Sequence, residues 1–499
     1  MRCALKPAVR YPAPGRQSAL KAEKMTKSFL LIPALMAFGL TGCVNLAPDN
    51  GTPASPTPQQ WPQGEAYAPL PAQADLLPQW RAVFTDAKLQ KVIELALANN
   101  RDLRTAALNV EKARAAYGVT RSAEFPSINA TGSNAAAHTA GTVNQTGVGR
   151  TGHNYTAQLA MAAFELDFFS RVRNMSEAAL QSYLATEDAQ RSSQSAIIAQ
   201  TAMAWHQLGA DREQLALQRR LLKSQEESYK LIQSSFEIGA ASKLDLEQAR
   251  TTMEAARANI VSYIRAVAQD KNALDLLCGS TVGEELLPEG LPSQAMASTV
   301  PVGLPGEVLL KRPDILAAER ALRAADANIG VARAAFFPRV TLVAGAGSAG
   351  LHLSDLFDAH SGMWSFTPSI SLPIFNGGLN KANLEVAKVE QRIAVADYEK
   401  AIQVAFKEVS NSLAQVGTAD RELEARQAYT DAADQAYQLS DISYKAGAVS
   451  YSDVLVAQRA MVQAHQVLIN TRLSKVSGLI TLYQALGGGS DLEKVEENK

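Results

Sequence analysis

The clearest periodic pattern in the chain is an alternation of apolar and hydroxylated residues from Trp364 to Ile374. A period of two predicts a β-strand with one apolar and one polar face. A second stretch, from Tyr155 to Phe169, has about the length that a tilted membrane strand needs. In a soluble sandwich the hydroxylated face would meet water, whereas in a membrane barrel it would line the lumen and the apolar face would meet lipid. The pattern alone leaves both alternatives open.

Long proline-free stretches, 173–208 and 210–277, follow the first predicted strand pair. Apolar residues recur every seventh position in the second stretch, at Leu215, Leu222, Tyr229 and Phe236. A sustained seven-residue period favours a left-handed coiled coil, although an ordinary helical bundle accounts for it equally well.

Glycines indicate where these long helices reverse direction. We expect the turns, and hence the tips of the rod, at Leu208-Gly209-Ala210 and Val416-Gly417-Thr418. Gly239 to Ser242 and Gly447 to Ser450 are then expected to interrupt the returning helices partway along the rod, as a belt.

The chain contains an internal duplication. Asp102 to Pro126 reappears as Asp314 to Pro338, with ten identical residues at a constant offset of 212. The segments around Tyr229 and Gly279 reappear around Tyr437 and Gly487 at an offset of 208. Each copy is expected to contain a helix of about 20 residues, two strands and long helices. One chain then supplies four strands, which cannot close a barrel, so the chain must oligomerise; a trimer would supply twelve.

Charge and composition exclude several functions. The 48 Lys and Arg nearly balance 49 Asp and Glu, which gives a net charge of −1 and no field that would gather nucleic acid. Val340 to Gly350 contains the glycine pattern of a dinucleotide site, but an alternating strand follows instead of the required helix. The six histidines lack metal-ligand spacing, and no nucleophile or phosphate-loop motif is present. We therefore expect neither an enzyme, a metal site nor a cofactor.

The N-terminus predicts export and lipidation. Residues 25–43 combine a short basic region, an apolar core and Leu40-Thr41-Gly42-Cys43, which resembles the bacterial lipobox. An ordinary signal peptide is the alternative. A start at either Met1 or Met25 fits the sequence. If Cys43 carries diacylglycerol and an N-acyl chain, these chains hold the N-terminus at a membrane. Val44 then implies the outer membrane, and the proline-rich range 48–78 is expected to be extended.

Taken together, these motifs resemble the TolC outer-membrane efflux channel family, most closely its lipoprotein branch typified by OprM. The resemblance extends over about residues 43–490 and rests on the lipobox, the paired Phe-Pro elements and three further motifs. Those motifs are Glu165 to Arg173, Leu372 to Gly378 and Tyr483 to Gly489.

The resemblance implies a homotrimer with a twelve-strand barrel in outer-membrane lipid and a helical tunnel in the periplasm. It also implies a periplasmic adaptor, an inner-membrane proton-driven pump and a gate at the helix tips. In the lipoprotein branch an acidic ring lies just before the second tip. Asn411 occupies that place here, and Glu408 is the alternative gate residue, although a solvated surface role suits Glu408 as well.

The sequence therefore predicts an internally duplicated α+β protein that acts as the passive, trimeric outer-membrane channel of a tripartite efflux system. It would export small molecules such as drugs or solvents. The rival function is a periplasmic coiled-coil adaptor lipoprotein without a pore. The expected segments are a signal region 1–42, a lipid-anchored strap 43–85, a first repeat 86–285, a linker 286–311, a second repeat 312–489 and a tail 490–499.

Overall fold

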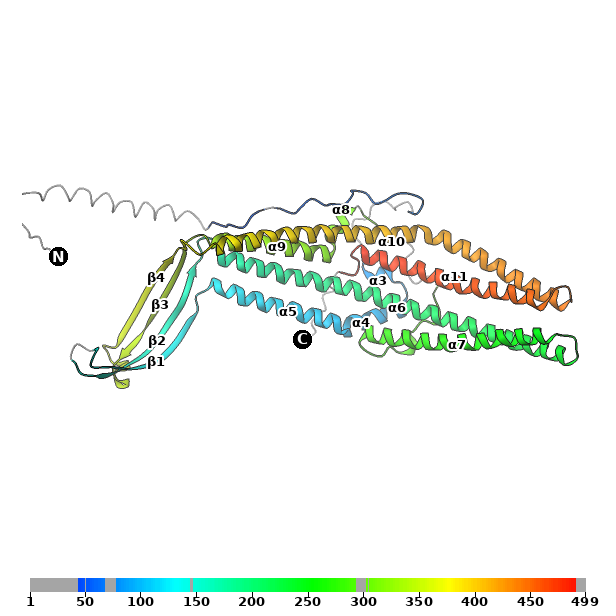
Figure 1. The fold of residues 1–499 in the computed structure, drawn as a ribbon, viewed down its shortest axis with the longest axis horizontal. Coiled ribbons are helices and arrows are strands. Elements are labelled where there is room, and N and C mark those ends of the chain that lie inside the picture. The colour runs from blue at the N-terminus through cyan, green and yellow to red at the C-terminus, as the bar shows by residue number, and fades with distance from the viewer. Residues whose placement is uncertain are drawn as a thin grey trace, which may run out of the picture.

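The computed structural model describes residues 44–49, 51–67, 78–143, 147–292, 302–303 and 305–490. The predicted signal region, Cys43 and the tail beyond residue 490 lie outside the described residues. The described chain is strongly elongated, with a sheet at one end and long helices that run away from it (Figure 1). No helix within these ranges combines the length and the apolar character needed to cross a bilayer.

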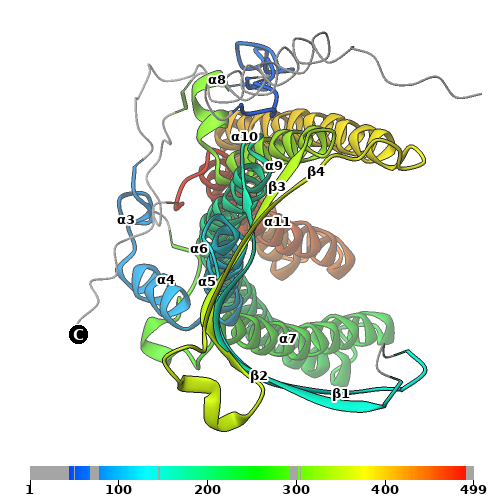
Figure 2. The same ribbon diagram turned by 90° about the vertical axis from the view of Figure 1, so that its left-hand side faces the viewer.

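The strands form one antiparallel sheet in the order β1-β2-β3-β4. Their bounds are β1 Ile128–Thr139, β2 Arg150–Leu166, β3 Arg339–Gly350 and β4 Gly362–Ser371. Seen from the sheet end, the strands curve in an arc over the ends of the helices (Figure 2). β4 covers most of the alternating stretch and β2 most of the second predicted stretch, and each ends three residues before the predicted end, at Ser371 and Leu166. The combination of this sheet with long helices confirms the α+β class.

The same series of long elements occurs twice along the chain. In the first series these are α5 Arg101–Arg121, α6 Arg171–Glu237 and α7 Lys243–Cys278, and in the second α9 Pro313–Ala334, α10 Leu379–Lys445 and α11 Tyr451–Ala485. α6 and α10 have 67 residues each. α5 and α9 end just before Pro126 and Pro338, because proline disfavours helix at the residue before it.

Short elements surround the middle of the long helices. They are α3 Trp80–Val83, α4 Ala87–Asn99, α8 Pro305–Val308 and the 3-10 turns η3 Glu284–Leu286 and η4 Leu309–Lys311. Two further 3-10 turns lie at the sheet: η2 Ser122–Glu124 precedes β1, and η5 Leu353–Phe357 connects β3 to β4. The main hydrophobic core lies at the middle of the long helices, where α4, α6, α7, α10 and α11 bury Phe84, Trp205, Tyr398 and Tyr483. A second, smaller core joins α6, α7 and α11 near the far end of the rod.

The N-terminal strap, residues 44–67 as far as described, contains no helix or strand. Its first residue, Val44, donates its N–H to Phe168 O (3.2 Å) at the junction of sheet and helices. Farther along, the buried Trp61 donates its indole N–H to Gly303 O (2.7 Å) and stacks on Phe406 of α10 with ring centroids 5.2 Å apart. The strap therefore connects the sheet junction to the main core.

Candidate channel and gate

The strand register separates the sheet into an apolar and a hydroxylated face. Residues opposite one another on antiparallel strands share a face. One face carries Ile128, Leu159, Met161, Phe164, Leu342, Trp364, Phe366 and Ile370. The other carries Asn129, Thr131, Ser133, Thr156, Gln158, Ser365, Thr367 and Ser369. Trp364 is 79% exposed and Ile370 70% exposed, so the apolar face is uncovered within one chain, as a lipid-facing surface requires.

The glycine pattern in β3 has a packing explanation. A Cβ atom at Gly347 would lie 2.2 Å from Ala157 O and 2.5 Å from the Cα of Gln158, so only glycine lets β2 and β3 approach this closely. After Gly350 the chain continues into η5 and β4, with no helix N-terminus that could hold a pyrophosphate.

A cluster of charges fixes the sheet to the helices. Glu165 lies on the hydroxylated face and accepts two hydrogen bonds from Arg171 at the start of α6 (2.7 and 2.6 Å). The same carboxylate contacts Arg339 at the start of β3 (2.6 Å). Asp167 accepts from the backbone N–H groups of Arg171 and Arg173 (2.6 and 2.8 Å) and so caps α6. Helix and strand are therefore joined by bidentate contacts at the base of the candidate pore.

The long helices reverse at two similar turns. α6 ends at Glu237 and α7 begins at Lys243; α10 ends at Lys445 and α11 begins at Tyr451. Gly239 (φ +78°) and Gly447 (φ +75°) take the left-handed conformation that lets the chain turn. Each returning helix then starts with a reciprocal Ser–Asp capping box, formed by Ser242 and Asp245 in one copy and by Ser450 and Asp453 in the other.

The prediction that the helices reverse at Gly209 and Gly417 is wrong. α6 runs unbroken through Leu208, Gly209 and Ala210, and all three are buried in the middle of the rod. α10 likewise runs unbroken through Val416, Gly417 and Thr418. The reason for glycine at 209 is close packing, because a Cβ there would lie 2.8 Å from Gly290 O. The segments at Gly239 and Gly447, expected to form a belt, are the tips.

The predicted gate residues also lie in the middle of the rod. Asn411 is exposed on α10 and lies 35 residues before Ala446, which at the α-helical rise is about 50 Å from the turn. Glu408 is half-buried, and its carboxylate accepts from Arg312 Nη2 (2.9 Å). Neither residue is at a helix tip, so the gate assignment fails because it depended on the wrong turn. The interpretation of Glu408 as a solvated surface residue is confirmed only in part, because its side chain is 43% exposed but is bound by Arg312.

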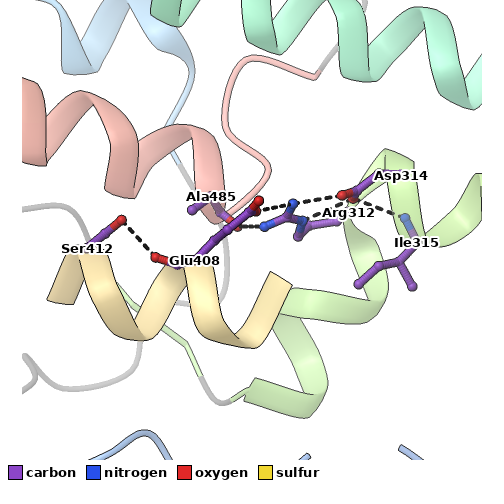
Figure 3. Close-up of polar contacts among 6 residues, drawn as sticks. All are labelled: Arg312, Asp314, Ile315, Glu408, Ser412 and Ala485. Carbon is purple, nitrogen blue, oxygen red and sulfur yellow. Dashed lines mark hydrogen bonds and ion pairs between the residues drawn. The ribbon is translucent and has the colours of Figure 1, made fainter. Parts of the chain in front are cut away.

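Arg312 is the centre of this mid-rod contact, as Figure 3 shows. Its guanidinium donates to both carboxylate oxygens of Asp314 (3.0 and 2.7 Å) and to the backbone carbonyl of Ala485 at the end of α11 (2.6 Å). Attraction to the two acids raises the pKa of the guanidinium although its burial opposes this. We call this set of contacts the Arg312 clamp. It joins the start of α9 and the end of α11 to the middle of α10.

Sequence reasoning missed this clamp and its counterpart in the first copy. Asn100, which is 212 residues before Arg312, donates from Nδ2 to Leu277 O at the end of α7 (2.8 Å). The Asn100 Oδ1 also accepts from Leu103 N (2.9 Å) and caps α5. We call this the Asn100 clamp. The duplication aligns Asn100 with Arg312 and Leu277 with Ala485, so an alignment of the two copies could have indicated both positions.

A sequence model described as "outer membrane efflux protein" matches residues 92–280 and 304–488. The chain belongs to this family of outer membrane efflux proteins. The family is one of transport channels rather than enzymes.

Relatives in the outer membrane efflux protein family resemble the chain over nearly its whole length. The probable efflux pump outer membrane protein TtgC of Pseudomonas putida is 45% identical over 469 residues, which cover 93% of this chain and 96% of that protein. The cation efflux system protein CusC of Escherichia coli is 41% identical over 92% of this chain and 98% of CusC. The crystal structure of the open state of the MtrE outer membrane channel of Neisseria gonorrhoeae superimposes with a TM-score of 0.81 at 35% identity, covering 90% of this chain and 99% of MtrE.

The chain is therefore the outer-membrane channel of a tripartite efflux system, located in the bacterial outer membrane and extending into the periplasm. This confirms the predicted function and location. The comparisons do not favour the rival, a periplasmic adaptor without a pore.

Proposed function

We propose that three copies of the chain assemble into one pore whose wall is a closed barrel of twelve strands. The observation that carries this proposal is the open sheet. It has four strands, and the edge strands β1 and β4 each pair on one side only within the described residues. Unpaired edges are too costly in lipid, so β1 of one copy pairs with β4 of the next. The hydroxylated face then lines the lumen.

Mass measurement and conductance test this assembly together. Purified full-length protein in detergent is expected to have three times the mass of the chain by light scattering, after correction for bound detergent. In planar bilayers the same preparation should conduct ions once its tips are loosened. A monomeric species without conductance would contradict the proposal.

The two helix turns form the surface on which a periplasmic adaptor docks, and the adaptor links the channel to an inner-membrane pump. Ile238 at the first turn is 82% exposed, and Leu244 beside it 65% exposed. Such exposed aliphatic side chains at the end of a rod suit a protein partner. Loss of the contact between the helix turns and the adaptor should weaken binding of the adaptor without affecting closure of the barrel.

A pair of substitutions tests the tip as docking surface. Ile238→Asp should reduce co-purification of the periplasmic adaptor by about tenfold, because a carboxylate would have to be desolvated. Leu108→Asp is the matched control, since Leu108 is half-exposed on α5 far from either turn. Equal capture by both variants, with both trimeric, would contradict the tip as docking surface.

Cys43 is the site of lipid attachment, and its acyl chains anchor the strap. Support comes from Val44, whose bond to Phe168 O places the start of the described strap at the junction of sheet and helices. Metabolic labelling with an alkyne-tagged palmitate should mark the wild-type protein and not Cys43→Ser. Cys278 is the internal control because it is buried. Labelling of Cys43→Ser would contradict the assignment.

The cargo consists of small toxic organic compounds. This inference comes from relatives, one of which is named a toluene efflux pump outer membrane protein at 45% identity. Deleting the gene should lower the toluene concentration that the cells survive, and the wild-type gene supplied in trans should restore it. Unchanged survival of the deletion strain in toluene, together with a lower tolerated concentration of dissolved metal salts, would redirect the cargo to metal cations.

A further inference from the structure

An aromatic stack joins the two copies of the repeat at the junction of sheet and helices. Phe169 lies between β2 and α6, Phe337 lies between α9 and β3, and their ring centroids are 4.6 Å apart. Both rings lie just beyond the last facing residues of β2 and β3, Leu166 and Val340. Stacked aromatic rings stabilise a contact beyond the apolar area that they bury. The stack therefore holds β2 and β3 together where they leave the sheet.

The duplication gives each of these rings a counterpart. Phe337 corresponds to Phe125 at the offset of 212. The segment Glu-Leu-Asp-Phe-Phe that ends at Phe169 aligns with Ser-Leu-Pro-Ile-Phe, which ends at Phe375. Within one chain these counterparts lie apart, because Phe125 precedes β1 and Phe375 follows β4, and these strands are the two edges of the sheet (Figure 1). Both rings are uncovered: Phe125 is 60% exposed and Phe375 is 90% exposed.

From these counterparts we propose that Phe375 of one copy of the chain stacks on Phe125 of the next copy, at every interface of the assembled channel. The inference rests on the proposed trimer, in which β4 of one copy lies beside β1 of the next. A ring that meets lipid needs no aromatic partner, whereas the counterpart of each of these rings is stacked on another ring. The partner of this surface is therefore a second copy of the chain.

The same alignment predicts the register between β4 and β1 of the next copy. The last facing residues of β2 and β3 have Leu372 and Ile128 as counterparts, and both of these are exposed within one chain. The next pair is then Ser371 with Asn129, which both belong to the hydroxylated face. The predicted register therefore keeps apolar residues opposite apolar ones and polar residues opposite polar ones. A slip by one residue would exchange the two faces.

The contact between copies has less polar support than its counterpart within the chain. Glu165 and Arg339 hold β2 and β3 together with a contact of 2.6 Å. Their counterparts are Ser371 and Ser127, which carry no charge. We therefore expect the aromatic stack and the aliphatic pair beside it to supply the main side-chain contacts where β4 and β1 meet at the base of the barrel.

Thiol cross-linking of the full-length protein tests the contact. In the Phe125→Cys/Phe375→Cys variant a short bismaleimide should link each copy to both neighbours and give a covalent trimer on a denaturing gel. The matched variant Phe169→Cys/Phe337→Cys should be linked within each chain and remain a monomer on the same gel. The wild-type protein is the background control, because Cys278 is buried. Light scattering of the untreated samples gives the mass of each assembly.

Two further samples keep the test decisive. Co-expressed Phe125→Cys and Phe375→Cys copies each retain one of the two rings and should give covalent dimers, so they serve if the double variant does not assemble. Trp364→Cys combined with Phe125→Cys should give no covalent trimer. Trp364 lies seven residues before Ser371, the end of β4, which corresponds to about 23 Å along the strand.

The outcomes separate this contact from the trimer itself. A trimeric mass without cross-linking of the double variant or of the co-expressed copies would overturn the aromatic contact and leave the trimer in place; this result is expected if the two rings face lipid. Equal cross-linking of the Trp364→Cys/Phe125→Cys control would also overturn the contact. A monomeric mass for the wild-type protein would instead overturn the proposed trimer.

Discussion

The two copies hold the end of the returning helix with different chemistry. In the Asn100 clamp a neutral amide donates to Leu277 O (2.8 Å). In the Arg312 clamp a guanidinium donates to the equivalent carbonyl, Ala485 O (2.6 Å), and is itself held by Asp314 and Glu408. The same carbonyl at the end of a helix is thus satisfied once by a single neutral bond and once by a buried charge with two counterions.

This difference shows which part of the duplication is fixed and which part is free. The fixed part is geometric: a helix end that must be capped and joined to the start of the short helix beside it. The free part is the side chain that donates the hydrogen bond to the helix end. Whether that donor is an amide or a guanidinium determines how much stability is lost when it is removed. A neutral hydrogen bond contributes about 1 kcal/mol, whereas breaking a buried ion pair leaves uncompensated charge and costs about 3 to 5 kcal/mol.

Removal of the Arg312 clamp should have the largest effect. Arg312→Ala leaves the buried Ala485 O without its donor and removes the packed guanidinium, while the half-exposed Asp314 and Glu408 can turn to water, so the fold should be destabilised by about 3 kcal/mol. Asn100→Ala loses one neutral bond and one helix cap, for about 1 to 2 kcal/mol. Thermal unfolding of the detergent-solubilised trimers, followed by circular dichroism, should rank them in that order. Equal melting temperatures would remove the distinction between the clamps.

Glycines at the same two helix ends should reverse that ranking. Gly279 (φ +61°) and Gly487 (φ +87°) both require the left-handed conformation. A Cβ at Gly279 would lie 2.2 Å from Asn99 O, whereas at Gly487 the nearest atom is Cγ of Arg312 at 3.4 Å. Gly279→Ala should therefore cost about 2 to 3 kcal/mol and Gly487→Ala about 1 kcal/mol, which is the conformational cost alone. Thermal unfolding of both variants measures the difference, and an equal or larger loss for Gly487→Ala would contradict it.

The sequence predicts those parts of the fold that rest on local patterns. Alternation between Trp364 and Ile374 predicts β4, and the position of Pro126 and Pro338 predicts where α5 and α9 end. The duplication predicts that the second copy repeats the order of long helices and strands found in the first. Alternation and proline determine the conformation of residues close to them in the sequence, so their effects can be predicted locally. The repeat is found by direct comparison of two segments of the chain.

The positions of the turns do not follow from glycine alone, because glycine serves both in turns and in close packing. Gly209 lies inside α6 because Gly290 packs against it, and that contact spans 81 residues of sequence. The decisive local signal was the Ser–x–x–Asp capping box after Gly239 and again after Gly447. Arg312 and Glu408 meet across 96 residues, and no local pattern indicates such a partner.

A buried histidine distinguishes the first copy further. His206 on α6 is fully buried against Trp205, and burial lowers its pKa to about 4. Its folded pKa is below the unfolded value of 6.5, so it favours folding above pH 6.5 and loses this contribution as pH falls toward 4. Between pH 6.5 and 5 the loss should be about 2 kcal/mol.

Comparison of variants isolates this effect, since Asp270 on α7 acts with the opposite sign. Burial, followed by the hydrogen bond and the charge of Asp211, raises the pKa of Asp270 to about 7, so its contribution to stability is lost as pH rises through 7. His206→Phe removes the titrating group and keeps an aromatic ring beside Trp205, so its melting temperature should decline less than that of the wild type between pH 7 and pH 5. Asp270→Asn should decline more than the wild type over the same interval. Parallel pH profiles for all three proteins would show that neither buried group acts as described.

The smallest effect should come from the tips, where the two copies are alike. Ser242 and Asp245 form the same reciprocal box as Ser450 and Asp453, with backbone bonds to each serine hydroxyl of 3.1 and 3.3 Å. Asp245→Ala and Asp453→Ala should each lower the stability of the helix start by about 1 kcal/mol, because each removes one exposed cap. The two losses should be nearly equal. Hydrogen exchange at the first turn of α7 and of α11 measures the two losses separately. A difference of more than about 1 kcal/mol between them would mean that the tips, like the clamps, have diverged in energy although their geometry is shared.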